Sequence, residues 1–288
     1  MRKIFFAFAL LLTIPSFAQE VVLITGTSRG IGLATAQFLA DKGYQVYGGV
    51  RQKSVAPYPH IHWEILDVTS PSDIQRVVTH IIEKEGHLDV LINNAGFALA
   101  GPVEMVSSQD FQEQIDVNVF GPIRLCQEVI PHMRKQHSGH IINISSCNAV
   151  WGLPFGSMYS ASKIALEHIS EALSIELAPW NIDVSIIEPG LVATQFTIRM
   201  GSKGIEGDPY KLYRESLQDY IDNRPILEPC QTSKEVAEFI YEVMCEEKPK
   251  LRYQTSSISK ETMAQNLIDL TGEKYRVEME RAIKEAYP

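Results

Sequence analysis

The chain has 288 residues and a formal net charge of −9 at pH 7. This acidic balance, with no basic stripe along the sequence, argues against nucleic acid as a partner. Apolar residues make up 45% of the chain, enough for a sizeable core. The four cysteines form neither a CxxC pair nor a metal-binding spacing, so we expect no disulfide framework and no metal. His60 and His62 fit alternate positions on a strand better than a metal site.

Residues 1–18 resemble a bacterial secretory signal peptide. Arg2 and Lys3 precede an apolar run over 4–14, and small residues stand at −3 and −1 before a cleavage site after Ala18. The run is too short for a comfortable membrane span. Cleavage would remove two positive charges and take the net charge from −9 to −11. We expect export, to the periplasm if the segment is cleaved, or membrane association. An uncleaved anchor, a start codon placed too far upstream and a cytoplasmic location stay open.

A strand, a glycine-rich turn and a helix are predicted in succession over residues 20–24, 25–32 and 33–40. This arrangement directs backbone N–H groups and a helix N-terminus at a phosphate. Glycines such as Gly26 and Gly30 let a pyrophosphate come close, because a Cβ would block it. An ordinary tight turn is the alternative, which the strand–turn–helix context disfavours.

Two later apolar strands, in 91–96 and 139–146, also end in polar residues. Strands and helices alternate to about residue 190, which is typical of repeated βαβ units. We therefore predict an α/β fold over 19–288, a single Rossmann-type doubly wound parallel sheet with helices on both faces and a C-terminal substrate lid over about 191–228. Ligands of such sheets lie at the carboxyl ends of the strands, so the polar ends should face one crevice.

Tyr159 and Lys163 are four residues apart, so on a helix they share one face. A free tyrosine has a pKa of about 10. A cation at about 4–5 Å and an effective dielectric constant of about 20 would lower that pKa by roughly two to three units. The pair then predicts a phenol able to give or take a proton near neutrality. Two solvated side chains on a helix are the alternative for the pair by itself.

These motifs together resemble the short-chain dehydrogenase/reductase family, in its compact branch, over about residues 21–194. The motifs are the turn at 25–32, Asp67-Val68, Asn93-Asn94-Ala95-Gly96, Asn118, Ser146, Tyr159, Lys163 and Pro189-Gly190 followed by Thr194. Three stretches, at 152–155, 159–167 and 251–255, resemble the group of type 1 17β-hydroxysteroid dehydrogenase and photoreceptor retinol dehydrogenase. This implies a bulky lipophilic alcohol or ketone as substrate, without identifying a steroid.

The resemblance also implies catalytic roles for an oxidoreductase. Tyr159 would be the general acid in reduction and the general base in oxidation, and Lys163 would lower its pKa and contact the nicotinamide ribose. Ser146 would bind the substrate oxygen. Asn118 would position a water linking Lys163 to solvent, or, alternatively, would bend a helix predicted over 110–136.

Cofactor contacts follow from the same resemblance. Asp67 would accept from the adenine amino group, with Val68 giving backbone contacts, although Asp67 could instead cap a turn. Asn94 would lie near the adenosine ribose, and Thr194 would hold the nicotinamide carboxamide. The pyrophosphate and ribose would be cradled by Gly26, Thr27, Arg29, Gly30, Ile31 and Gly32.

The second strand carries the signal for the choice of cofactor. Val50 stands where an acid would bind the 2′-hydroxyl of NAD, and Arg51 follows it. With Arg29, two guanidiniums and no carboxylate describe a pocket for a 2′-phosphate. We predict NADP(H) over NAD(H); a merely solvated Arg51 is the alternative.

The remaining expectations concern the C-terminus and assembly. A helical extension over about 256–288 could cover the cleft, pack on a subunit or rest on a membrane, the last disfavoured by its mixed charge. Family resemblance suggests a homodimer through helices around 108–136 and 157–178. A non-catalytic NADP(H)-binding regulator is the alternative to an enzyme, disfavoured because the catalytic residues are kept. A lyase or epimerase is disfavoured by the glycine spacing.

Overall fold

The computed structural model describes residues 19–52, 55–201, 203, 209–212, 215 and 230–268. The predicted signal segment, most of the predicted lid and the chain after residue 268 lie outside these ranges. No helix among the described residues is both long and apolar enough to cross a membrane.

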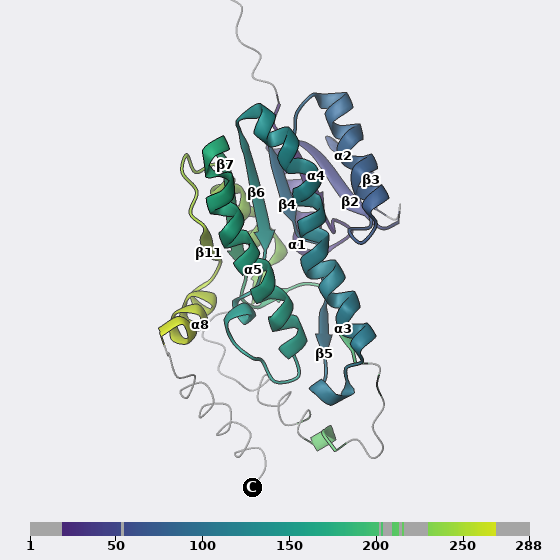
Figure 1. The fold of residues 1–288 in the computed structure, drawn as a ribbon, viewed down its shortest axis with the longest axis vertical. Helices are drawn as coiled ribbons and strands as arrows, with labels where there is room; N and C mark the ends of the chain where they lie inside the picture. The colour runs from purple at the N-terminus through teal and green to yellow at the C-terminus, as the bar shows by residue number, and fades with distance from the viewer. Residues whose placement is uncertain are drawn as a thin grey trace, which may run out of the picture.

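A seven-stranded sheet forms the centre of the molecule, with the strand order β11-β7-β6-β4-β1-β2-β3 (Figure 1). Every neighbouring pair in it is parallel. The chain runs outward from β1 to β3 and then returns to place β4 on the other side of β1, which creates a switch point there. The predicted α/β doubly wound fold is confirmed. The strands are β1 Val21–Thr25, β2 Gln45–Val50, β3 Ile61–Ile65, β4 Val90–Asn93, β6 Gly139–Ile144, β7 Ile182–Glu188 and β11 Arg252–Gln254.

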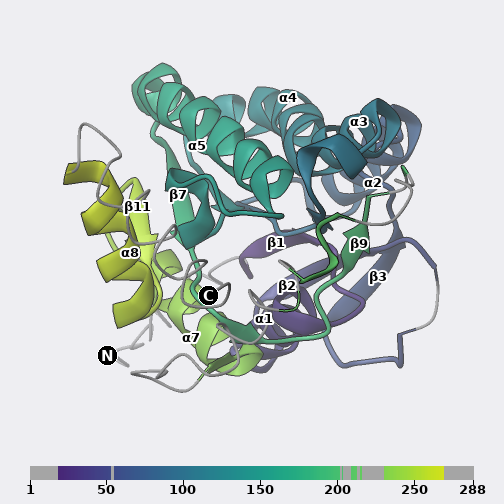
Figure 2. The ribbon, with the colours of Figure 1, turned by 90° about the horizontal axis from the view of Figure 1, so that it is seen from below.

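Helices cover both faces of the sheet (Figure 2). Helices α2, α4 and α5 lie over one face with α3, and α1 and α7 lie over the other; α8 lies beside β11. The helices are α1 Gly30–Asp41, α2 Pro71–Glu85, α3 Ser108–Ile115, α4 Gly121–Gln136, α5 Ser157–Leu177, α7 Ser233–Met244 and α8 Ser257–Ile268.

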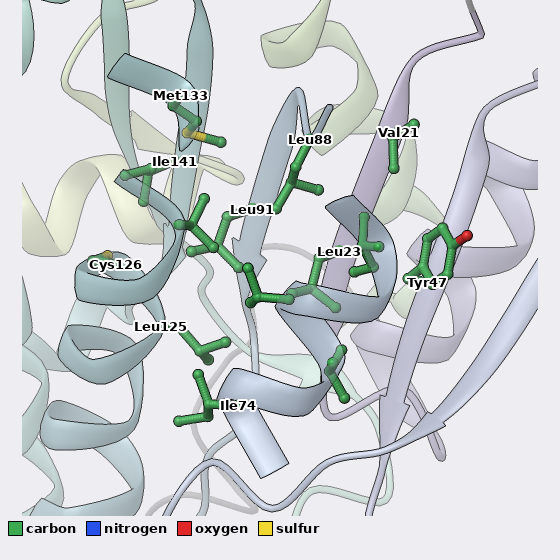
Figure 3. Packing of buried hydrophobic residues seen from close by; sticks show 14 of the residues in the cluster. Val21, Leu23, Tyr47, Ile74, Leu88, Leu91, Leu125, Cys126, Met133 and Ile141 are labelled. Carbon is green, nitrogen blue, oxygen red and sulfur yellow. The ribbon is translucent and has the colours of Figure 1, made fainter. Parts of the chain in front are cut away.

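Alternation along β1 divides the core into two layers. Val21 and Leu23 join the cluster under α2, α4 and α5 (Figure 3), whereas Val22 and Ile24 join the cluster against α1 and α7. Both faces of a central parallel strand are buried, which explains why its sequence is apolar without a break. This packing fixes the carboxyl ends of the strands along one edge.

The helix predicted over 110–136 is interrupted. It starts at Ser108, passes through a π-helical turn over Asp116–Phe120 and continues as α4 from Gly121. A Cβ on Gly121 would lie 2.8 Å from Cγ2 of Val68, so the glycine allows α4 to approach the loop after β3. The interruption is therefore a π turn, and Asn118 lies inside it.

Short strands and 3₁₀ turns lie beyond the carboxyl ends of the main strands. β5 (Ala98–Ala100) pairs in parallel with β9 (Ile198–Met200), and β8 (Val192–Ala193) pairs with β10 (Gln231–Thr232). The 3₁₀ turns are η1 Val103–Met105, η3 Cys147–Val150 and η4 Ala178–Trp180. The start of the predicted lid is thus tied to the chain that follows β4.

Candidate active site

A cleft of about 1000 Å³ runs along the carboxyl ends of the strands. Most of the predicted site residues line it: Gly26, Arg29, Gly30, Ile31, Arg51, Asp67, Val68, Asn94, Ser146, Tyr159, Lys163 and Thr194. Thr27, Gly32 and Asn118 are buried behind its wall instead. The sequence therefore predicted which strand ends meet, but three of the predicted site residues lie beneath the surface of the cleft and do not line it.

Two glycines of the glycine-rich turn are packed so tightly that a side chain would not fit there. A Cβ on Gly26, whose φ is +70°, would lie 2.8 Å from Cα of Ala95. A Cβ on Gly32 would lie 2.4 Å from both Nδ2 of Asn94 and the carbonyl oxygen of Gly26. The Thr27 hydroxyl donates to the Gly49 carbonyl at 3.0 Å. This interlocking fixes the backbone of the turn.

The N-terminus of α1 follows this turn and faces the cleft. Its N-cap residue is Arg29, whose side chain makes no capping hydrogen bond, so the first N–H groups of the helix remain available to an anion. The Asn94 amide donates to the carbonyl oxygens of Thr25 and Gly26 and so braces the turn from the next strand. Backbone N–H groups beside closely packed glycines form a cradle that fits the pyrophosphate of a dinucleotide.

The end of the cleft that was predicted to hold the adenosine has two exposed guanidiniums and one carboxylate. Arg29 and Arg51 are both exposed, and Arg29 also donates to the Thr197 hydroxyl. Asp67 Oδ1 accepts from the backbone N–H of Thr69 at 2.9 Å and from its hydroxyl at 2.7 Å. Asp67 therefore caps a turn, as the alternative expected, and lines the cleft as well.

The catalytic candidates converge from β6 and α5. Ser146 follows β6 as the N-cap of η3, and its Oγ accepts from the Asn148 N–H at 3.2 Å. Lys163 is 5% exposed, and its Nζ donates to the Ile144 carbonyl at 2.7 Å. The same Nζ lies 5.8 Å from the ring centroid of Tyr159. The two predicted helix residues do share one face.

The electrostatics differ from the prediction. Burial raises the pKa of Tyr159 to about 12, which a hydrogen bond with Ser146 partly opposes. Burial likewise lowers the pKa of Lys163 to about 8, and the nearby Glu167 carboxylate opposes this. The predicted lowering of the Tyr159 pKa by Lys163 is thus absent. The physical reason is that desolvation of both groups outweighs an attraction that Lys163 partly satisfies at a carbonyl.

Asn118 lies inside the π turn and is 1% exposed. Its Nδ2 donates to the Phe97 carbonyl at 2.9 Å and to the Ser162 hydroxyl at 3.0 Å. Its Oδ1 accepts from the Phe97 N–H at 3.1 Å. These contacts engage both the amide nitrogen and the amide oxygen of the Asn118 side chain. A water link to Lys163 stays a prediction.

The sequence named Phe196 as one of several candidates for a pocket wall, but it predicted neither the contact of Phe196 with Tyr159 nor a buried pair of carboxylates. Phe196 packs edge-on to Tyr159, with ring centroids 5.9 Å apart. Glu167 and Glu188 are fully buried and share Arg252. The position of Glu167, four residues after Lys163, is a signal that could have been noticed, since it repeats the spacing of the tyrosine and lysine. Nothing local links either residue to position 252.

Among the described residues, we find no second site built from cysteines or other metal-binding side chains. Cys126 and Cys147 are buried and free, and burial raises the pKa of the Cys147 thiol to about 11. Within the described ranges, no group of three or more His, Cys, Asp or Glu side chains could hold a metal ion.

Comparison of the sequence with known protein families identifies the family of this chain. A family model described as short chain dehydrogenase matches residues 20–203. The chain belongs to the short-chain dehydrogenase family of oxidoreductases. A nicotinamide cofactor is typical of short-chain dehydrogenases, and the cradle described above fits one.

Several curated short-chain dehydrogenases are similar to this chain. The 3-ketodihydrosphingosine reductase of Bacteroides thetaiotaomicron is 42% identical over 178 residues, a match that covers 62% of this chain and 66% of that protein, just under two thirds. Human retinol dehydrogenase 8 is 32% identical, covering 90% of this chain and 88% of that protein. Human 17-beta-hydroxysteroid dehydrogenase type 1 is 31% identical, covering 92% and 86%. The resemblance to this group is confirmed.

Solved structures agree on the fold. A short-chain dehydrogenase from Streptomyces avermitilis superposes with a TM-score of 0.79 at 29% identity, covering 92% of this chain and 97% of that one. ElxO with NADP bound gives a TM-score of 0.68 at 26% identity, covering 84% and 99%. A 3-ketoacyl-(acyl-carrier-protein) reductase from Brucella melitensis complexed with NADH also gives 0.68, at 24% identity over 82% and 96%.

Proposed function

We propose that this protein is an NADP(H)-dependent oxidoreductase that interconverts an alcohol and a carbonyl group on a lipophilic substrate. The observation that carries the proposal is the meeting of Ser146, Tyr159 and Lys163 in the cleft that the glycine-rich turn also lines. A bound nicotinamide would donate or accept the hydride. The protein's own residues bind it, orient the substrate and move the proton.

The proton chemistry falls to Tyr159. With a pKa of about 12, its phenol is protonated at neutral pH and ready to act as a general acid in reduction. The Ser146 hydroxyl donates to the substrate oxygen, where negative charge develops. The contact of Lys163 with the Ile144 carbonyl holds its ammonium on the face of α5 that carries Tyr159, where it would bind the nicotinamide ribose. Asn118 supports this arrangement from the π turn.

The preference for NADP(H) rests on the adenosine end of the cleft. Arg29 and Arg51 line it with exposed guanidiniums, and the end of β2 offers the buried, apolar Val50 in place of an acid. Guanidinium groups bind phosphate through paired charge-assisted hydrogen bonds. ElxO, one of the similar structures, is a complex with NADP.

Support for a lipophilic substrate comes from the apolar walls of the cleft. Leu153, Phe155, Leu191, Phe196 and Met200 line it. The similar proteins are named for ketodihydrosphingosine, retinol and a hydroxysteroid, which are all lipophilic compounds. No residue among these fixes which such compound is bound.

Oxidation of NADPH with a panel of sphingoid, retinoid and steroid carbonyl compounds tests the proposal. We expect turnover with at least one member, and a higher kcat/KM for NADPH than for NADH. Equal kcat/KM for the two cofactors would refute the preference. Binding of NADPH without turnover of any substrate would instead support the non-catalytic regulator.

The predicted homodimer and the predicted export are also our proposals. Sedimentation of the purified protein should give a mass of two chains. N-terminal sequencing of the protein from its host tests the export. The mature chain should begin at Gln19 if the signal segment is cleaved, and at Met1 if the segment stays attached.

A further inference from the structure

A buried cluster of charges lies directly beside Lys163. Glu167 on α5 and Glu188 on β7 both have fully buried side chains. Arg252 on β11 pairs with Glu167, and its Nη1 lies 2.9 Å from Oε1 of Glu188. Gln254 also donates to Glu188. We name Glu167, Glu188 and Arg252 the β11 cluster.

One member of the β11 cluster, Glu167, lies on α5, the helix that also carries Tyr159 and Lys163. Glu167 is one turn after Lys163 on α5, and both side chains are buried. An ionised carboxylate at this spacing favours the ammonium over the neutral amine. Arg252 pairs with both buried carboxylates and also lies 3.5 Å from the more exposed Glu171 carboxylate on α5.

The same carboxylate reaches the end of β6. Ser145 Oγ donates to Oε1 of Glu167 at 2.6 Å, and Ser145 N donates to the Ile187 carbonyl at 2.7 Å. Ser146 comes next in the chain, and Ile144, just before, accepts from Lys163. Glu167 therefore lies on the helix that carries Tyr159 and Lys163, and it binds the segment after β6 that carries Ser146.

We propose that Glu167, held by Arg252 and Ser145, is a positioning residue that keeps Lys163 protonated and fixes the end of β6 that carries Ser146. Its catalytic meaning rests on the proposed function, but its effect on Lys163 does not. Arg252 lies beyond residue 203, where the match to the family model ends. In this protein a late strand thus supports a site built by the first two thirds of the fold.

Other groups around Lys163 do not replace this carboxylate. On α5, Tyr159 has its pKa raised to about 12, and beside β6, Cys147 has its pKa raised to about 11, so both are neutral below pH 10. The π turn contributes the neutral Asn118, and the chain after β4 contributes Gly96. From β7 and β11 come Glu188 and Arg252, which pair with each other.

Titration of Lys163 by NMR tests the proposal without any turnover. Lysine labelled with ¹³C at Cε reports the charge of each ammonium, and the Lys163 signal is the one missing from Lys163→Met. Glu167→Gln keeps an acceptor for Ser145 but removes the charge, so we expect the Lys163 pKa to fall by about one unit. Glu176→Gln, an exposed change on the same helix, is the matched control and should leave the pKa unchanged.

Glu167→Asp keeps the negative charge but shortens the side chain by one methylene, which moves the carboxylate away from Lys163. In this variant the pKa of Lys163 should therefore lie between its values in the wild type and in Glu167→Gln. A Lys163 pKa in Glu167→Gln equal to that in the control would overturn the proposal, as would an Asp variant as low as the Gln variant. If Glu167→Gln does not fold, an Asp variant identical to the wild type would overturn it. A wild type without turnover, together with a shifted Lys163 pKa in Glu167→Gln, would count against the proposed function alone.

Discussion

Replacing Lys163 by methionine should change how stability depends on pH. The pKa of Lys163 is lowered from 10.5 to about 8 because its ammonium is buried. A difference of about 2.5 pH units, at about 1.36 kcal/mol each, corresponds to about 3 kcal/mol. The side chain is 5% exposed, so screening by solvent removes little of this.

The sign follows from proton linkage. Because the folded pKa lies below the unfolded one, the unfolded chain binds more protons between pH 8 and pH 10.5. The contribution of Lys163 to stability is therefore complete above pH 10.5 and is lost as the pH falls through about 8. The methionine variant also leaves the Ile144 carbonyl without its donor, but this offset does not depend on pH.

Urea denaturation of both proteins between pH 7 and pH 10 measures the effect. The free energy of unfolding of the wild type, minus that of Lys163→Met, should rise by about 2–3 kcal/mol across this range. Lys135→Met removes an exposed ammonium on α4 and serves as the control, with a nearly constant difference. A difference for Lys163→Met that stays as constant as that of the control would refute the claim that burial lowers the pKa of Lys163.

Four further outcomes are expected. Tyr159→Phe should lower kcat of carbonyl reduction by about 10²–10⁴-fold while NADPH binding, followed by fluorescence, stays nearly intact; retained turnover would exclude Tyr159 as the general acid. Arg51→Ala should raise KM for NADPH by roughly tenfold or more and leave KM for NADH unchanged. An equal effect on both cofactors would contradict a contact with the 2′-phosphate. Gly32→Ala should destabilise the fold by about 1–3 kcal/mol because its Cβ would lie 2.4 Å from neighbouring atoms. Gly152→Ala, whose added Cβ would meet no atom within 4 Å, is the control, and thermal melting of both variants measures the difference. The rate of reduction should fall as the pH rises through about 8, where Lys163 loses its proton, and a pH-independent rate up to pH 10 would argue against a required ammonium.

The sequence by itself determined the fold class and most of the cleft. Apolar runs followed by glycine, asparagine and serine identify buried strands and their carboxyl ends, and parallel topology then brings those ends together. The spacing of Tyr159 and Lys163 likewise needs only the periodicity of a helix. These inferences succeed because each depends on residues that are neighbours along the chain.

Only the tertiary structure decided the electrostatics and the supporting contacts. Desolvation raises the pKa of Tyr159 against the prediction, because burial is set by every element around the site. The π turn at Asn118 depends on contacts with Phe97 and Ser162, 21 and 44 residues away. Arg252 meets Glu167 across 85 residues. No local pattern encodes such contacts, since they arise when separate strands and helices are packed into one core.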